Sequence, residues 1–169
     1  MIRSLLLVVG FLSSAYMCAS TGPPEPFEVR LAPGVTQMEE LAFSVSYPGK
    51  SSPVMCRELE AYSGIFVDEP LREEWKARAP KALPCPNPLK WGQDLGEGWE
   101  VFIAAKPVEQ NRSYRLRLSA EGGGKGAVDF CIFRNGDMVV DDNAASESTS
   151  RREEMVRCRN EDRQEAVVP

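Results

Sequence analysis

The chain has 169 residues, which suits one domain, and it carries 20 basic against 25 acidic side chains for a net charge of −5. An acidic chain lacks the basic stripe that nucleic-acid binders present, so we expect no nucleic-acid partner. The sequence contains no histidine, which excludes hydrolysis through a histidine base, histidine phosphotransfer and most zinc sites. We therefore expect neither a metal nor a cofactor.

The first 20 residues are typical of an export signal. Arg3 precedes the apolar run Leu5–Leu12 and a stretch of small residues, and this run is shorter than the roughly 20 residues that cross a bilayer. Residues 1–26 resemble the start of a bacterial lipoprotein precursor, because Cys18 is followed by a polar, proline-rich tether. In that family the cysteine is acylated and becomes the first residue, and small residues stand before it.

Two cleavage points therefore stay open, because this chain has Tyr16 and Met17 before the cysteine. Cleavage between positions 17 and 18 would leave Cys18 as a lipid anchor, whereas cleavage after Ser20 would release the chain. Cleavage after Ala15 also obeys the small-residue rule but would leave an odd cysteine. We expect an extracytoplasmic protein, either lipid-anchored in a bacterial cell envelope or secreted to the periplasm or beyond, that touches the membrane only through Cys18.

Behind the leader the composition divides the chain into three parts. Residues 19–26 are a linker, residues 27–159 a single domain, and residues 160–169 a polar tail. The domain holds four cysteines: Cys56, Cys85, Cys131 and Cys158. An even number in an exported protein predicts two disulfides. Four cysteines allow three pairings, and the sequence does not choose among them. Of the three we favour 56–85 with 131–158, since each bridge closes a moderate loop that is worth roughly 3–4 kcal/mol of chain entropy.

Alternation of apolar with polar residues predicts two strands at the start of the domain. Apolar side chains recur at every second position over residues 27–31 and 41–47, as in a strand with one buried face. Pro33–Gly34 ends the first strand and Pro48–Gly49 the second. The pair is typical of the opening of an antiparallel β-sandwich, immunoglobulin-like or similar. We predict a mainly β domain with one short helix and disulfides.

The short helix is expected over residues 68–79. Leu71, Trp75 and Ala79 recur every four residues behind Asp68, a good capping residue, so the helix would lay Trp75 on the core.

Strands and an irregular loop are expected around that helix. Strand signals lie at residues 54–56 and 64–67 before it and at 98–105 after it, where Trp99, Val101 and Ile103 should share one side. Between them, the proline-rich residues 81–91 predict an extended loop.

The clearest pattern lies between Asn111 and Asp142. Apolar and polar residues alternate over 114–119, glycines break the chain at 121–126, and a second strand runs over 127–134. Asn135–Gly136 favours a two-residue hairpin loop, because both positions tolerate positive φ.

That loop fixes a register for the third strand. It places Ile132 opposite Val139 on the face of Val128 and Phe130, and it groups Cys131, Phe133, Met138 and Val140 on the other. Both faces are then apolar, so we expect this hairpin to be covered on both sides. Ser150 and Glu153 form a possible capping box, yet residues 150–159 also fit an edge strand, and the two alternatives stay open.

The groups that could carry chemistry all have plainer interpretations. The glycine run at 122–126 lacks the spacing of a phosphate loop and predicts a turn. The adjacent acids Glu73–Glu74 and Asp141–Asp142 suit a solvated surface. A calcium site at Asp137, Asp141 and Asp142 would lack the EF-hand spacing. Asn111-Arg112-Ser113 fits the short glycosylation pattern.

We therefore predict no catalytic site and a non-enzymatic binding or accessory role. The partner would be a protein or a glycan, and Trp91, in the loop region, is the tryptophan most suited to stack on a sugar. One alternative is a small hydrolase or lyase that uses carboxylates alone. Another is a secreted protease inhibitor that presents the loop Pro84-Cys85-Pro86.

Overall fold

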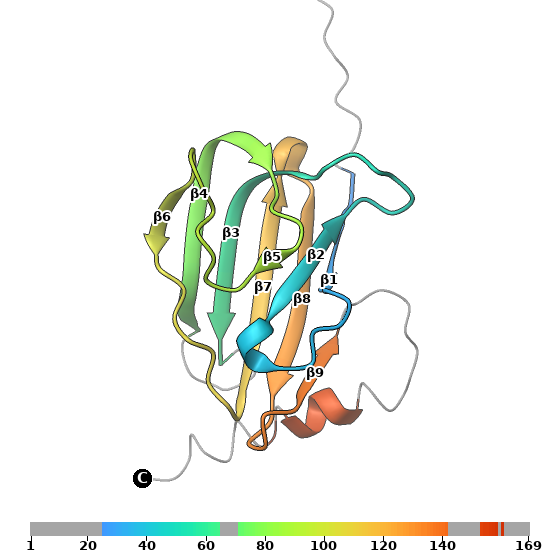
Figure 1. Ribbon diagram of the computed structural model, residues 1–169, viewed down its shortest axis with the longest axis vertical. Coiled ribbons are helices and arrows are strands. Elements are labelled where there is room, and N and C mark those ends of the chain that lie inside the picture. The colour runs from blue at the N-terminus through green and yellow to red at the C-terminus, as the bar shows by residue number, and fades with distance from the viewer. Residues whose placement is uncertain (1–24, 65–70, 142–152, 159, 161–169) are drawn as a thin grey trace, which may run out of the picture.

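A computed structural model describes residues 25–64, 71–141, 153–158 and 160. Two antiparallel sheets pack face to face (Figure 1). This confirms the predicted mainly β sandwich. The export signal, Cys18, most of the linker and the polar tail beyond residue 160 lie outside the described residues. Within them, no helix is long and apolar enough to span a membrane.

The small sheet has three strands in the order β1-β2-β5, and the large sheet has six in the order β6-β4-β3-β7-β8-β9. The strands are β1 (Glu28–Leu31), β2 (Ala42–Ser46), β3 (Met55–Ser63), β4 (Arg72–Pro84), β5 (Leu89–Lys90), β6 (Glu100–Ile103), β7 (Arg112–Ala120), β8 (Lys125–Ile132) and β9 (Met138–Asp141). Two short 3-10 turns, η1 (Met38–Glu40) and η2 (Glu121–Gly123), complete the order. The small sheet lies over β7 and β8, and β6 lies at the far edge of the large sheet (Figure 1).

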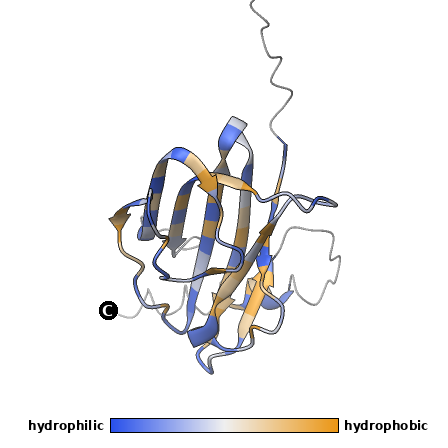
Figure 2. Cartoon of the chain, turned by 45° about the horizontal axis from the view of Figure 1, so that its top comes forward, coloured by the Kyte–Doolittle hydropathy of each residue, from blue (hydrophilic) through white to orange (hydrophobic). Residues whose placement is uncertain are grey.

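The core fills the space between the two layers. The buried residues of β7 include Tyr114, Leu116 and Leu118, while Arg117 between them is exposed, as the alternation predicts. Figure 2 shows this change of polarity along the strands of the large sheet. The first two predicted strands are also confirmed as β1 and β2, whose inward residues include Val29 and Phe43.

The helix expected over residues 68–79 is wrong. Residues 72–84 form β4, in which Trp75, Ala77 and Ala79 are buried in strand alternation. A spacing of four residues is also a multiple of two, so Trp75 and Ala79 share one face of a strand as well as of a helix. Trp75 nevertheless reaches the core, as predicted.

Pro80 lies inside β4, although it was expected to end the element. The ladder between β3 and β4 is irregular between Cys56 and Glu58, the stretch that lies beside Pro80. At such an irregularity a missing N–H costs no regular ladder bond, which is why a strand tolerates proline there. The Pro80 carbonyl instead accepts a hydrogen bond from Arg57 Nη2 at 2.7 Å. β4 also takes in Lys81–Pro84 and β5 takes in Leu89–Lys90, so only residues 85–88 and Trp91 of the proline-rich stretch lie outside the strands.

The register predicted for the last hairpin is wrong by one residue. Ile132 pairs with Met138 and Cys131 with Val139. The loop has three residues, because the Phe133 N–H donates to Asp137 O at 2.8 Å. A three-residue loop needs positive φ at only one position, here Gly136 with φ 87°.

The new register moves Val139 to the face of Cys131 and Phe133. The short helix at residues 153–158 covers that face with Met155 and Cys158, both almost fully buried. The hairpin is thus covered on both sides, as predicted, and the open choice at 150–159 resolves to helix for the described part. Arg157 places its guanidinium 4.8 Å from the centre of the Phe133 ring.

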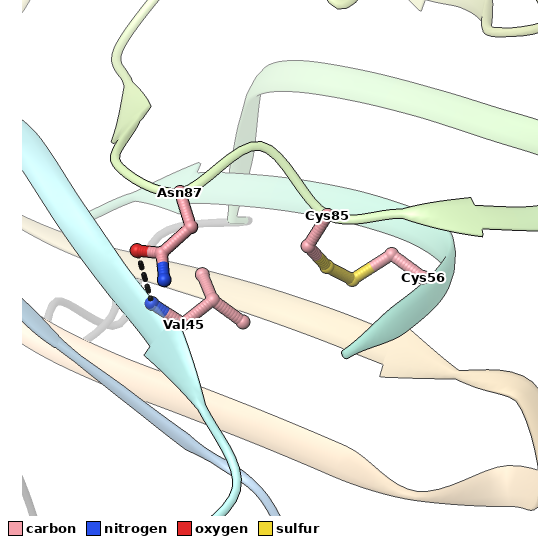
Figure 3. The surroundings of a disulfide bond; sticks show 4 residues. All are labelled: Val45, Cys56, Cys85 and Asn87. Carbon is pink, nitrogen blue, oxygen red and sulfur yellow. Dashed lines mark hydrogen bonds between the residues drawn. A yellow bond between two sulfur atoms is a disulfide. The ribbon is translucent and has the colours of Figure 1, made fainter. Parts of the chain in front are cut away.

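The two disulfides join Cys56 to Cys85 and Cys131 to Cys158, the pairs favoured from loop length. Their Cα atoms are 5.2 and 6.2 Å apart, within the range that such bridges need. The first bridge closes β3 onto the segment that follows β4 (Figure 3). Beside it, Asn87 Oδ1 accepts the Val45 N–H at 3.3 Å and so extends the very short pairing between β2 and β5.

Close packing of β1 on β8 leads to a first prediction. A Cβ at Gly126 would lie 2.6 Å from Phe27 Cε2 and 2.9 Å from Val29 Cγ2, both side chains of the core. We expect Gly126→Ala to lower the free energy of unfolding by about 1–3 kcal/mol through overpacking. Urea unfolding checks this, with Lys125→Ala at the exposed neighbouring position as a control that should change little. Equal stability of Gly126→Ala and the parent chain would contradict the described packing of β1 on β8.

Candidate functional site

Glu74 is a buried carboxylate that the sequence pattern did not reveal. Tyr62 pairs with Glu73 and Ala61 with Trp75, so Glu74 is the extra residue of a β-bulge in β4. Glu74 is 6% exposed and Trp75 2%, so two consecutive side chains are buried. The expected solvated surface holds for Glu73 and is wrong for Glu74, because a bulge breaks the alternation of side chains.

Ser63 and Lys106 satisfy the Glu74 carboxylate. Ser63 Oγ, at the end of β3, donates a hydrogen bond to Glu74 Oε1. Lys106 Nζ lies 3.3 Å from Glu74 Oε2 and donates to Glu73 O at 2.9 Å. The Lys106 N–H also donates to Glu74 O at 3.0 Å. This network fastens the chain after β6 to the bulge in β4.

A serine, a carboxylate and a lysine are groups that nucleophilic catalysis uses. Ser63 has no exposed surface, so a substrate cannot reach its hydroxyl while this end of the sandwich stays closed. The hydroxyl proton of Ser63 also forms the hydrogen bond to Glu74. The arrangement is that of a buried charge that needs hydrogen-bond partners to be tolerated. We assign it a structural role.

Trp91 is half-buried at the margin of the core rather than displayed on a loop. Its ring lies 5.8 Å from Trp75, 5.7 Å from Tyr114 and 5.8 Å from Phe130, between ring centroids. Its Nε1 donates to Lys106 O at 2.8 Å. These contacts give Trp91 a packing role, and its contact with a sugar stays a prediction.

Tyr114 is the most deeply set polar group of this aromatic cluster. Burial raises the pKa of Tyr114 to about 12, and the N–H of Glu109 donates to its hydroxyl at 2.7 Å. The neutral phenol is therefore retained at any ordinary pH. Tyr114 acts as a core residue with a satisfied hydroxyl.

The other candidate residues do not meet at one place. Asp137 accepts from Asn135 Nδ2 in the hairpin loop, Asp141 ends β9, and Asp142 is outside the described residues. In the part of the chain that the structure describes, no group of three or more acids and cysteines could hold a metal ion. Asn111 is only 9% exposed, so a glycan on its side chain would disturb the start of β7.

The inhibitor hypothesis concerns the loop around Cys85. Cys85 is buried, bonded to Cys56, and its N–H donates to Val54 O at 2.8 Å. Pro84 is the last residue of β4. The loop is thus held against the sandwich, and inhibition of a protease stays a prediction.

The outer face of the large sheet carries charges whose sign alternates from strand to strand. Arg78 lies 3.6 Å from Glu58 and Lys76 lies 3.6 Å from Glu60, each between neighbouring strands. Arg115 forms two hydrogen bonds with Asp129, which raise the pKa of the arginine further. Opposite charges on adjacent strands stabilise a sheet, and of the charges in these pairs Asp129 is buried while the others keep exposed surface. This surface shows no single sign that would select a charged partner.

The strand β6 differs from that face because it is an apolar edge. Val101 is 53% exposed and Phe102 is 61% exposed, and among the described strands β6 pairs with β4 alone. The small sheet lies over β7 and β8, on the half of the large sheet away from β6 (Figure 1). It therefore does not cover β6. In Figure 2 β6 is an apolar strand at the margin of the molecule. We call residues 100–103 the β6 edge.

A second bulge shapes the β6 edge. Ile103 pairs with Lys76 and Val101 with Ala77, so Phe102 has no partner on β4. The prediction that Trp99, Val101 and Ile103 share one side is wrong, because the bulge moves Val101 and Ile103 to different faces. No sequence signal marks this bulge. The exposure of Phe102 is therefore a property that only the tertiary structure reveals.

Comparison of the chain with family models, with curated proteins and with solved structures finds no significant match. The functional argument therefore depends on the residues and the geometry of this chain.

The Glu74 network leads to a second prediction. Glu74→Ala removes the acceptor of a buried hydroxyl and should lower the free energy of unfolding by about 2–3 kcal/mol. Glu73→Ala, its exposed neighbour, loses only a surface contact with Lys76 and should change stability little. Chemical denaturation of the two variants makes the comparison. Equal losses would contradict the structural role of Glu74.

Proposed function

We propose that the chain is an exported, envelope-associated binding or accessory protein that acts without catalysis and contacts a partner protein through the β6 edge. The observation that carries the binding role is the exposure of Phe102 and Val101 on an edge strand of a folded, disulfide-closed sandwich. Large apolar side chains on an uncovered edge are typical of interaction sites.

Export is supported by two independent features. The leader has the charge, apolar run and small residues of a signal peptide. Two disulfides suit an oxidising compartment. The tether at Cys18 would then hold the domain near a membrane as a lipoprotein, whereas cleavage after Ser20 would free it.

Energetics favour Phe102 as the centre of the contact. Burying apolar surface yields roughly 25 cal/mol per Å², and binding energy at interfaces is concentrated in a few large side chains. The bulge holds Phe102 clear of the β4 ladder, so a partner could bury it with little rearrangement of the sheet.

The export proposal predicts the form of the native N-terminus. The mature chain should begin at Cys18 carrying lipid, or at Thr21 without it, as measured by mass spectrometry of protein from its own cells. Thiol labelling without reductant should leave Cys56, Cys85, Cys131 and Cys158 unmodified. A chain that still begins at Met1 inside the cell, with reactive thiols, would overturn the proposal.

The binding proposal predicts contact at Phe102 in intact cells. A photo-reactive amino acid placed at Phe102 should give a discrete cross-linked product, and Val101→Asp in the same chain should abolish it. Leu71, also 53% exposed, is the matched control position and should give no such product. The proposal fails if position 102 yields nothing, or if both positions yield the same products.

A further inference from the structure

We infer that the β6 edge receives an extended, cationic and apolar segment of the partner protein. This inference rests on the proposed function and names the chemistry of the partner. It joins two features of the same segment: the uncovered apolar side chains of β6 and a set of carboxylates in the chain that leads into it.

The acidic feature lies at Asp94, Glu97 and Glu100, which are all exposed. Residues 92–105 contain these three acids and no lysine or arginine. Within the described part of the chain, none of the three carboxylates forms an ion pair. Arg78 pairs across the ladder with Glu100, but its guanidinium faces Glu58. The field of residues 92–105 is therefore negative, and the cations opposite β6 on β4, Lys76 and Arg78, are already paired with Glu58, Glu60 and Glu73.

Cationic side chains of a partner complement this field, and its apolar side chains complement Val101 and Phe102. Complementary charges raise the association rate and select the partner. An alternation of lysine or arginine with apolar residues presents both features at once in an extended segment, because side chains at every second position share one face. An edge strand is the place where such a segment can lie alongside a sheet.

The bulge also counts against a second copy of the chain as the occupant. A symmetric antiparallel pairing centred on Phe102 would set Val101 opposite Ile103 of the other copy. Those two residues lie on different faces of β6, since Val101 pairs with buried Ala77 and Ile103 with Lys76 on the outer face. Opposed side chains must share a face, so this register is unfavourable. A second copy would also bring the same unneutralised carboxylates.

The bulge also limits how the segment is held. β6 has only four residues and an irregular backbone at Phe102, so few main-chain hydrogen bonds are available to an added strand. Affinity must then come chiefly from the apolar side chains and from charge. Binding should accordingly depend on Phe102 and on salt.

A peptide series tests this directly on the purified, disulfide-intact protein. The probe is a short synthetic peptide in which lysine alternates with valine and phenylalanine, with blocked ends. Two matched peptides carry glutamate or glutamine in place of every lysine. Fluorescence anisotropy of labelled peptides measures binding to the parent chain and to each variant, and circular dichroism confirms that the variants are folded.

We expect the lysine peptide to bind and the glutamate peptide not to bind. Phe102→Asp should weaken binding by about tenfold or more, as loss of a central apolar side chain does. Glu97→Gln combined with Glu100→Gln should weaken it roughly 3- to 10-fold and reduce its dependence on salt. Leu71→Asp should leave it unchanged.

Four results would overturn the inference. Equal binding of the glutamine and lysine peptides would remove the role of charge. If Phe102→Asp does not affect binding of the lysine peptide, the peptide binds somewhere other than the β6 edge. If no peptide binds, this class of partner is excluded. Concentration-dependent dimerisation that Phe102→Asp abolishes would make a second copy the occupant. A specific cross-link at Phe102 together with any of these results would leave the proposed binding role intact.

Discussion

The packing of Phe130 holds the two layers of this protein together. Its ring stacks on Tyr114 of the neighbouring strand at 5.1 Å and meets Phe43 of the small sheet at 5.5 Å. It also contacts Trp91, just after β5, at 5.8 Å. The small sheet has three strands, and β5 has only two residues, so these ring contacts and the bridge from Cys56 to Cys85 add to the backbone pairing that holds it in place.

That limited small sheet explains the uneven surface. It covers β7 and β8 but not β6 (Figure 1), and the short helix at residues 153–158 covers the opposite face of β8 and β9. Both faces of the last hairpin are therefore covered by other parts of the chain. Within the described part of the chain, Val101 and Phe102 of β6 remain exposed, which is the origin of the interaction surface that we propose.

Two bulges on adjacent strands have opposite effects. The bulge in β4 turns Glu74 into the interior, where Ser63 and Lys106 satisfy its charge. The bulge in β6 frees Phe102 from the ladder and leaves it exposed. A polar side chain is thereby buried and an apolar one displayed, which reverses the usual pattern at this edge. Because Lys106 lies three residues after the end of β6, the buried network also anchors the chain at that end of the exposed edge.

The sequence by itself determined the sandwich class, the alternation of β7 and the burial of Trp75, and loop length favoured the two cysteine pairs that the structure then showed. Each depends on a local period or on loop length, which the order of residues contains. The tertiary structure alone decided that residues 72–84 are a strand. A four-residue spacing of apolar residues fits both a helix and a strand, and pairing with the neighbouring strands selects the strand. It alone also set the hairpin register through Gly136 and the exposure of Phe102 through a bulge. Bulges and registers arise from the fit between strands that are distant in the chain, and for that reason no single stretch of sequence reveals them.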